Sequence, residues 1–270
     1  MRKILFAVDA LNVHTNSLDL ATFISNLTKS KLTGIFLENV LEEEVVAEGY
    51  PSSEEELSAN QREAITDQNI QLFKEACENR GVCPSISRDR GIPASELIEE
   101  TRFADLLIIE PSLSFKRKIQ GSPTTFVKTI LSQASCPVIV SPESFEGIDE
   151  IVFAYDGSDS SILAIKQFTY LFPEFNNRKI NLLEVNKDNE FIIKNKHKIA
   201  DWLKVYYTQI GFEVLNGDAE AELFKYFLEK RNVLLVMGAY GRNMLSSFFR
   251  ESSAELIMKT TNLPVFIAHC

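Results

Sequence analysis

The chain has 270 residues, of which 45% are hydrophobic and 24% charged, with only 11 glycines and 9 prolines. This composition excludes a disordered, collagen-like or low-complexity protein, and at about 100–200 residues per domain the length permits two domains or one large one. The 38 acidic residues outnumber the 28 basic ones, and the net charge of −10 disfavours general attraction to nucleic acid or anionic lipid.

The first apolar run, Ile4–Val8, ends at Asp9 and is much shorter than the apolar core of a signal peptide. No run approaches the about 20 apolar residues that cross a bilayer. The four cysteines show neither a C-x-x-C motif nor the His/Cys spacing of a metal site, a usage that suits a reducing compartment. We therefore expect a cytoplasmic protein without a membrane segment, a metal site or bound nucleic acid.

The sequence contains an internal repeat. Ile4–Asp9 (ILFAVD) reappears as Ile151–Asp156 (IVFAYD) at an offset of 147, and Pro137–Val140 is echoed by Pro264–Ile267 at an offset of 127. The first copy therefore carries 20 extra residues, which we assign to Leu41–Asn60. That stretch has seven glutamates and no apolar periodicity, so it reads as a mobile, acidic surface insertion. A repeat of this period indicates a domain duplication.

The first copy alternates short apolar runs with amphipathic ones, which predicts βαβ units feeding a parallel sheet. Its strands are expected near Lys3–Asp9, Lys31–Leu37, Val82–Arg88, Leu106–Glu110 and Val138–Val140. Its helices are expected over Ser17–Thr28 and Gln61–Asn79 and from near Pro93 and Pro123, since proline is tolerated in a first helical turn.

The second copy repeats this order. Its strands are expected near Glu150–Tyr155, Lys179–Val185, Phe212–Leu215, Val233–Gly238 and Val265–Ala268. The spacing of Leu223, Phe224, Phe227 and Leu228 predicts a helix lying on a sheet. Ser141–Asp149 contains Pro142 and Gly147 and forms the boundary, so we expect domains over 1–143 and 149–270.

Five strands with helical crossovers imply an α/β protein with two tandem, doubly wound, five-stranded parallel sheets of the Rossmann-like, nucleotide-binding type. Ligands of such sheets bind outside the carboxyl ends of the strands, here after Val8, Val185 and Met237 and after their counterparts in the other copy. The two Pro-Val strands end each sheet, and unpaired edge strands invite pairing. We expect the copies to pair within the chain, with homodimerisation in addition. A single continuous sheet, or lobes that fail to superpose, would contradict the duplication.

The loop after the fourth strand of the second copy runs from Gly238 through Gly241 to Arg250 and opens a helix at Glu251-Ser252-Ser253. Glycines let a backbone approach a ligand closely, and N–H groups at a helix start hold an anion. A tight strand-to-loop turn requires the same glycines, so a phosphate cradle and a structural turn both remain open.

Here the sequence resembles the universal stress protein family, as a tandem of two domains over essentially the whole chain. The resemblance rests on the strands ending in Asp9 and Asp156-Gly157-Ser158, on Gly238-x-x-Gly241 and on the terminal Pro-Val strands. ATP-binding members carry G-x-x-G, nine residues, then G-[S/T]. In this chain Arg242–Arg250 supplies the nine residues and Ser252 the hydroxyl, but Glu251 replaces the third glycine.

The resemblance implies a site for ATP, with Mg²⁺, in the second copy. Its residues are Asp156, Val185, Gly238, Gly241, Arg242, Arg250, Ser252 and Ser253. Glu251 would add crowding and like-charge repulsion against a triphosphate, which only Arg242, Arg250 or a divalent cation would offset. Asp156 matches the family's nucleotide-side aspartate, although a residue that closes the strand-to-helix turn explains it equally well.

The first copy departs from the pattern in a complementary way. Glu110-Pro111-Ser112-Leu113 stands where G-x-x-G is expected, and Gly121-Ser122 retains the closing pair. The basic run Lys116-Arg117-Lys118 has two interpretations: a contact with phosphate, or an ordinary solvated turn. Since proline and bulky residues do not follow the glycine path, we expect no ATP in the first copy.

No catalytic group emerges, because His14, His197 and His269 are scattered and lack a metal-ligand or nucleophile partner. The leading hypothesis is therefore a non-enzymatic, nucleotide-binding stress-response module acting through the second copy. The alternative is an interaction protein that binds no nucleotide because both pockets have decayed. Glu251 and Glu110, which replace glycines of the family motif, favour this alternative. A slow ATPase is the third hypothesis, with Asp156 as its one named residue.

Overall fold

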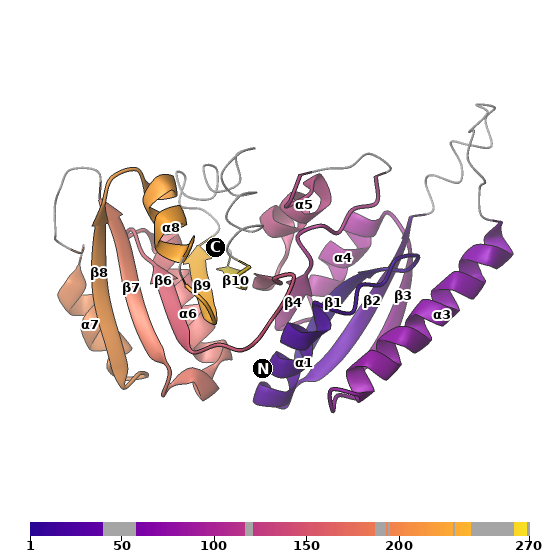
Figure 1. Ribbon diagram of the computed structural model, residues 1–270, viewed down its shortest axis with the longest axis horizontal. Helices are drawn as coiled ribbons and strands as arrows, with labels where there is room; N and C mark the ends of the chain where they lie inside the picture. The colour runs from indigo at the N-terminus through magenta and orange to yellow at the C-terminus, as the bar shows by residue number, and fades with distance from the viewer. Residues whose placement is uncertain are drawn as a thin grey trace.

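The computed structural model describes residues 1–39, 58–116, 121–186, 193, 195–228, 230–238 and 262–268, without the side chain of residue 220. Figure 1 shows two lobes side by side, each with helices packed on its strands. The insertion assigned to Leu41–Asn60 lies outside the described residues except for its last three, which begin a helix.

The first half of the chain supplies five strands and four helices among the described residues. They are β1 (Lys3–Asp9), α1 (Leu18–Thr28), β2 (Lys31–Asn39), α3 (Ala59–Glu78), β3 (Ser85–Gly91), α4 (Pro93–Thr101), β4 (Leu106–Ile109), α5 (Thr125–Gln133) and β5 (Val138–Val140). The second half repeats the order. It contains β6 (Glu150–Ala154), α6 (Asp159–Leu171), a 3₁₀ turn η1 (Pro173–Phe175), β7 (Lys179–Asn186), α7 (Lys196–Leu203), β8 (Gln209–Asn216), α8 (Ala219–Leu228), β9 (Val233–Gly238) and β10 (Val265–Ala268).

The ten strands form one continuous sheet in the order β3-β2-β1-β4-β5-β10-β9-β6-β7-β8. Every pair within each half is parallel, and the halves join where β10 runs antiparallel to β5. The expectation that a continuous sheet would contradict a duplication was wrong, because two like sheets joined at their edge strands also give one sheet. Reading outward from the junction, both halves have the same order: fifth strand, fourth, first, second, third.

Two apolar clusters cover the two faces of the sheet, as strand alternation requires. Ile4 and Phe6 of β1 contribute to the cluster under α1, α3, α6 and α7, whereas Leu5 and Ala7 contribute to the cluster under α4, α5 and α8. The helices therefore lie on both faces, and the predicted doubly wound architecture is confirmed.

Helix starts follow from local chemistry. Ser58 and Gln61 form a reciprocal capping box at the start of α3, and Pro93 occupies the first position of α4. The helix expected from near Pro123 is confirmed: α5 begins at Thr125, where the Thr124 side chain accepts a hydrogen bond from the backbone N–H of Val127.

Two further sequence predictions need correction. The third strand was expected over Val82–Arg88 but lies three residues later, at Ser85–Gly91. Of the apolar stripe on α8, Leu223 and Phe227 are buried as expected, whereas Leu228 is 49% exposed at the end of the helix. In the described part of the chain, no helix combines the length and the apolar character needed to cross a membrane.

Phe266, on the junction strand β10, is fully buried, and its ring lies 5.3 Å from that of Phe168 and 6.1 Å from that of Phe172. Removing a buried phenylalanine leaves a cavity that close-packed neighbours fill only in part. We predict that Phe266→Ala lowers the free energy of unfolding by about 3–5 kcal/mol in urea titrations.

Phe103→Ala is the matched control, since Phe103 is 69% exposed. The free energy of unfolding of this variant should change by about 0.5 kcal/mol or less, as for ordinary surface positions. Equal losses for the two variants would contradict the packing described here.

Candidate functional site

Asp156 lies just beyond the carboxyl end of β6 and shapes the turn into α6. Its Oδ1 accepts a hydrogen bond from the backbone N–H of Ser158 at 2.9 Å, and the Ser158 hydroxyl caps α6 by accepting from the N–H of Ser161. Burial alone would raise the pKa of Asp156, but hydrogen bonds from Ser158 and Ser161 outweigh it and hold that pKa below its ordinary value. The group is therefore a stable carboxylate, and the turn interpretation of Asp156 has direct support.

Gly238 ends β9 and lies against the first turn of α6. A Cβ at this position would fall 2.5 Å from the backbone C and O atoms of Ser160. No side chain fits at that separation, so close helix-to-strand contact is sufficient reason for a glycine here. The glycine is thus explained by packing, whether or not a ligand also approaches it.

Val185 is the penultimate residue of β7 and is half-buried, with Leu215 of β8 as its register partner. Next to it, Glu184 and Tyr155 are both buried. Burial, with the charges of Glu184 and Asp156, raises the pKa of Tyr155. Because β9, β6 and β7 are neighbours in the sheet, Gly238, Asp156 and Val185 lie at one carboxyl edge. The other site residues predicted from the sequence, Gly241, Arg242, Arg250, Ser252 and Ser253, lie outside the described residues, as does Glu251.

Asp9 occupies the corresponding position after β1 and makes the same local turn. Its Oδ1 accepts a hydrogen bond from the backbone N–H of Leu11 at 2.9 Å. Burial is the dominant influence and raises its pKa, against the opposing effects of the Leu11 hydrogen bond and His14. The two repeated aspartates thus share a backbone geometry but differ in the direction of their pKa shifts.

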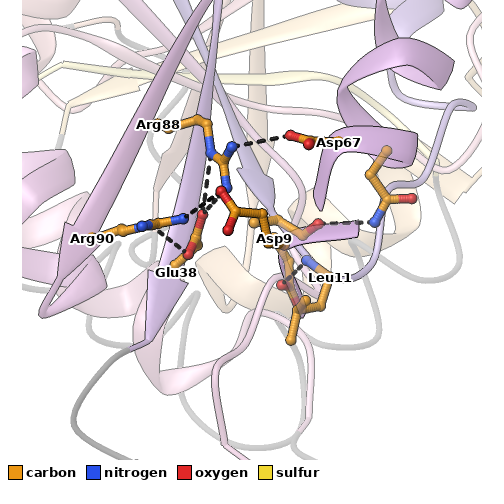
Figure 2. A network of polar contacts seen from close by, with 9 residues as sticks. Asp9, Leu11, Glu38, Asp67, Arg88 and Arg90 are labelled. Atoms are coloured by element: carbon orange, nitrogen blue, oxygen red, sulfur yellow. Dashed lines mark hydrogen bonds and ion pairs between the residues drawn. The ribbon is translucent and has the colours of Figure 1, made fainter. Parts of the chain in front are cut away.

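An ion-pair network occupies the carboxyl edge of the first half (Figure 2). Glu38, near the end of β2, receives hydrogen bonds from Arg88 at 3.1 Å and from Arg90 at 3.0 Å, both on β3. The two arginines extend to α3, where Arg88 pairs with Asp67 at 3.0 Å and Arg90 with Glu63 at 3.6 Å. Sequence reasoning missed this network because the carboxyl-edge rule was applied after the first, second and fourth strands alone. The Arg88-Asp89-Arg90 run at the end of the third strand was the available signal.

Glu110 follows β4 and takes the place that Gly238 takes in the second half. The registers establish this equivalence, because Phe6 pairs with Ile108 and Phe153 with Val236. The Glu110 carboxylate accepts a hydrogen bond from the Ser17 hydroxyl at the start of α1, and it lies 3.0 Å from His14 Nδ1. Instead of a glycine turn, the first half has a carboxylate tied to the preceding strand-to-helix loop.

Of the remaining sequence candidates, the structure describes Lys116 and, on α7, His197, and both side chains are exposed. Arg117, Lys118 and His269 lie outside the described residues. Over the described ranges, no group of three or more His, Cys, Asp or Glu side chains is arranged to hold a metal ion.

No protein-family model matches the chain. Among curated proteins, "Universal stress protein Slr1230" of Synechocystis sp. (strain ATCC 27184 / PCC 6803 / Kazusa) is 26% identical over 163 residues. This match covers 60% of the chain and 56% of that protein, so the chain spans little more than half the length of this relative.

Solved structures share the fold over the whole length. A universal stress protein from Archaeoglobus fulgidus DSM 4304 has a TM-score of 0.70 at 12% identity, covering 99% of this chain and 98% of that one. A protein from Pseudomonas aeruginosa UCBPP-PA14 has a TM-score of 0.57 at 15% identity, covering 99% and 93%. In sequence the chain is thus similar to a universal stress protein, and its fold is the one that solved structures of such proteins share.

Proposed function

We propose that this chain is a nucleotide-binding universal stress protein whose second half holds ATP or a related phosphate ligand. The site lies at the carboxyl edge formed by Asp156, Val185 and Gly238. Arg242 and Arg250 are the phosphate-binding cations of this proposal, and the protein acts by binding rather than by turnover.

One observation carries the proposal: equivalent positions of the two halves carry different charges. The strand registers align Glu38, Arg88 and Arg90 of the first half with Asn186, Val214 and Asn216 of the second. Three ionised side chains are thus replaced by two amides and a valine. A neutral, partly apolar wall suits a nucleotide base better than an edge filled by ion pairs. The second half therefore retains the features of a binding edge, and the first half does not.

Asp156 has the chemistry for a directional contact with a nucleotide. Its low pKa keeps it ionised near neutral pH, so it accepts hydrogen bonds from ligand donors such as ribose hydroxyls. Val185, half-buried one strand away, offers apolar contact to a base. Glu251 opposes the phosphates, and Mg²⁺ is the counter-ion that a carboxylate and a triphosphate share most readily. Magnesium is accordingly part of the proposed ligand.

We further propose that the halves are two domains, 1–143 and 149–270, in a cytoplasmic protein. The register of Val265 with Val140, Phe266 with Ile139 and Ile267 with Val138 supports pairing of these domains within the chain. Because β5 and β10 occupy each other's edges, a homodimer would use a different surface.

We predict that millimolar Mg-ATP raises the melting temperature, because a ligand that binds only the folded state stabilises it by mass action. Asp156→Ala should remove most of this shift. Asp9→Ala, the same change at the equivalent turn of the first half, is the matched control and should retain it. Differential scanning fluorimetry measures all three proteins.

No ATP-dependent shift in the unsubstituted protein would overturn nucleotide binding and favour the ligand-free interaction protein. A shift abolished by Asp9→Ala and kept by Asp156→Ala would move the ligand to the first half.

We predict opposite pH signatures for the two aspartates. A depressed folded-state pKa means that ionised Asp156 stabilises the fold above the ordinary pKa of 3.8, and this stability is lost as pH falls through the folded pKa. A raised pKa means that Asp9 favours the fold in its protonated form, a contribution lost as pH rises.

In urea titrations, Asp156→Asn should therefore lower stability at pH 7, with the deficit shrinking below pH 3.8. Asp9→Asn should cause no deficit at pH 7. The reverse ranking at pH 7 would show that the electrostatic assignment is wrong.

We predict that Gly238→Ala destabilises the protein by about 1–3 kcal/mol, as overpacking against backbone does. Gly91→Ala is a close control, since its Cβ would also meet an atom at 2.5 Å, but that atom is Oε1 of the Glu96 side chain, which can rotate away. Chemical denaturation should show a loss of under about 1 kcal/mol for the control. Similar losses in both variants would contradict the packing explanation for Gly238.

A further inference from the structure

A cavity of about 250 Å³ lies at the amino ends of β9 and β10, at the end of the sheet opposite the proposed nucleotide edge. Its walls come from the linker between the halves and from the turns that precede the two strands. By contrast, Asp156 and Gly238 lie at the carboxyl ends of β6 and β9. A ligand here would occupy a site separate from the proposed nucleotide site.

The walls of this cavity are held in place by hydrogen bonds. Asn262 donates to the carbonyl oxygen of Ser144 at 2.9 Å and accepts from the Ser144 backbone N–H at 3.1 Å. Asn232 donates to the Asp149 carboxylate at 3.0 Å. Both asparagines adopt left-handed backbone conformations, with φ of 46° and 54°. Asparagine tolerates this conformation well, and the side-chain hydrogen bonds of Asn232 and Asn262 connect the turns before β9 and β10 to the linker.

The linker side of the cavity also reaches the first half. The Phe145 ring lines the cavity and packs 5.1 Å from the ring of Phe23 on α1. Together with Leu228, Leu263 and Pro264, it gives the cavity apolar surface beside its polar groups.

Three ionisable side chains line the cavity: Lys230, Arg231 and Glu146. Lys230 is already engaged, since its ammonium lies 3.2 Å from the Glu150 carboxylate and 4.7 Å from the centre of the Tyr226 ring. Arg231 is exposed and forms no ion pair with another described residue. Its planar guanidinium binds carboxylates in a bidentate geometry. The lining is mainly polar, with a cation beside a smaller apolar area, and its net charge is positive in a chain of net charge −10.

We propose that this cavity binds a small organic carboxylate, with its carboxylate on Arg231 and its apolar body against Phe145, Leu228 and Leu263. An engineered cavity of about 150 Å³ holds benzene, so about 250 Å³ admits a ligand of about ten non-hydrogen atoms. The ligand touches the linker and the second half together, and its presence therefore reinforces the connection between the halves.

Isothermal titration calorimetry of the full chain with phenylacetate tests the proposal. We expect measurable binding, and Arg231→Gln should weaken it about tenfold or more, the loss expected for a charge-assisted bidentate pair. Arg102→Gln is the matched control, because Arg102 is an exposed arginine just after α4 that pairs with Glu99 at 2.9 Å. This variant should bind phenylacetate within twofold of the unsubstituted protein.

Two further probes separate charge from shape. Phenylacetamide, the neutral analogue, should bind at least tenfold more weakly than phenylacetate, and so should inorganic phosphate, which lacks the apolar body. Equal binding of either probe, no phenylacetate binding at 10 mM (about −3 kcal/mol as an upper limit on affinity), or an Arg231→Gln variant that binds normally would overturn the proposal.

Competition between Mg-ATP and phenylacetate distinguishes the proposed nucleotide site from the proposed carboxylate site. Saturating Mg-ATP should leave phenylacetate binding unchanged, and Asp156→Ala should bind phenylacetate as the unsubstituted protein does. Displacement by Mg-ATP would show that phenylacetate occupies the nucleotide site and would overturn the separate cavity site.

Discussion

The antiparallel pairing of β5 with β10 is the interaction on which the rest of the architecture depends. Each strand is short, with three and four residues, and all of them are buried. An edge strand left open would expose unpaired backbone groups. Joining the two edges satisfies those groups and brings both halves into one sheet. It also places Phe266 under α6, where its ring meets Phe168 and Phe172. Phe266, one of the residues that close the sheet, therefore also packs on the helix that follows the Asp156 turn.

Much of the fold is predictable from sequence because apolar runs and repeats are local signals. β1, β5, β9 and β10 match their expected bounds, since each is an uninterrupted apolar run ended by a polar residue, glycine or a turn. The third strand was misplaced because its residues, from Ser85 to Gly91, are mostly polar and half-buried, so their pattern is weak. The start of α5 was located to within two residues of Pro123, and the Thr124 cap fixes it at Thr125.

For the candidate site, the sequence predicted the positions of residues but not their chemistry. Asp156, Val185 and Gly238 were identified from strand ends, and the register places them at one edge. Their chemistry was not accessible, because pKa depends on which hydrogen bonds form around each carboxylate. Asp9 and Asp156 have the same sequence context of an apolar strand followed by a turn, yet Ser158 and Ser161 stabilise one charge and burial opposes the other. Likewise, Glu38 is 50 and 52 residues from Arg88 and Arg90, and only strand register brings it to them.

The linker between the halves has a consequence for how the molecule moves. In its middle, Ser144 is hydrogen-bonded to Asn262 of the second half, and the adjacent Phe145 packs on Phe23 of the first half. A segment anchored on both sides does not act as a free hinge. Relative rotation of the lobes would break these contacts and the strand junction at once, so mechanical strain applied to one lobe is transmitted to the other.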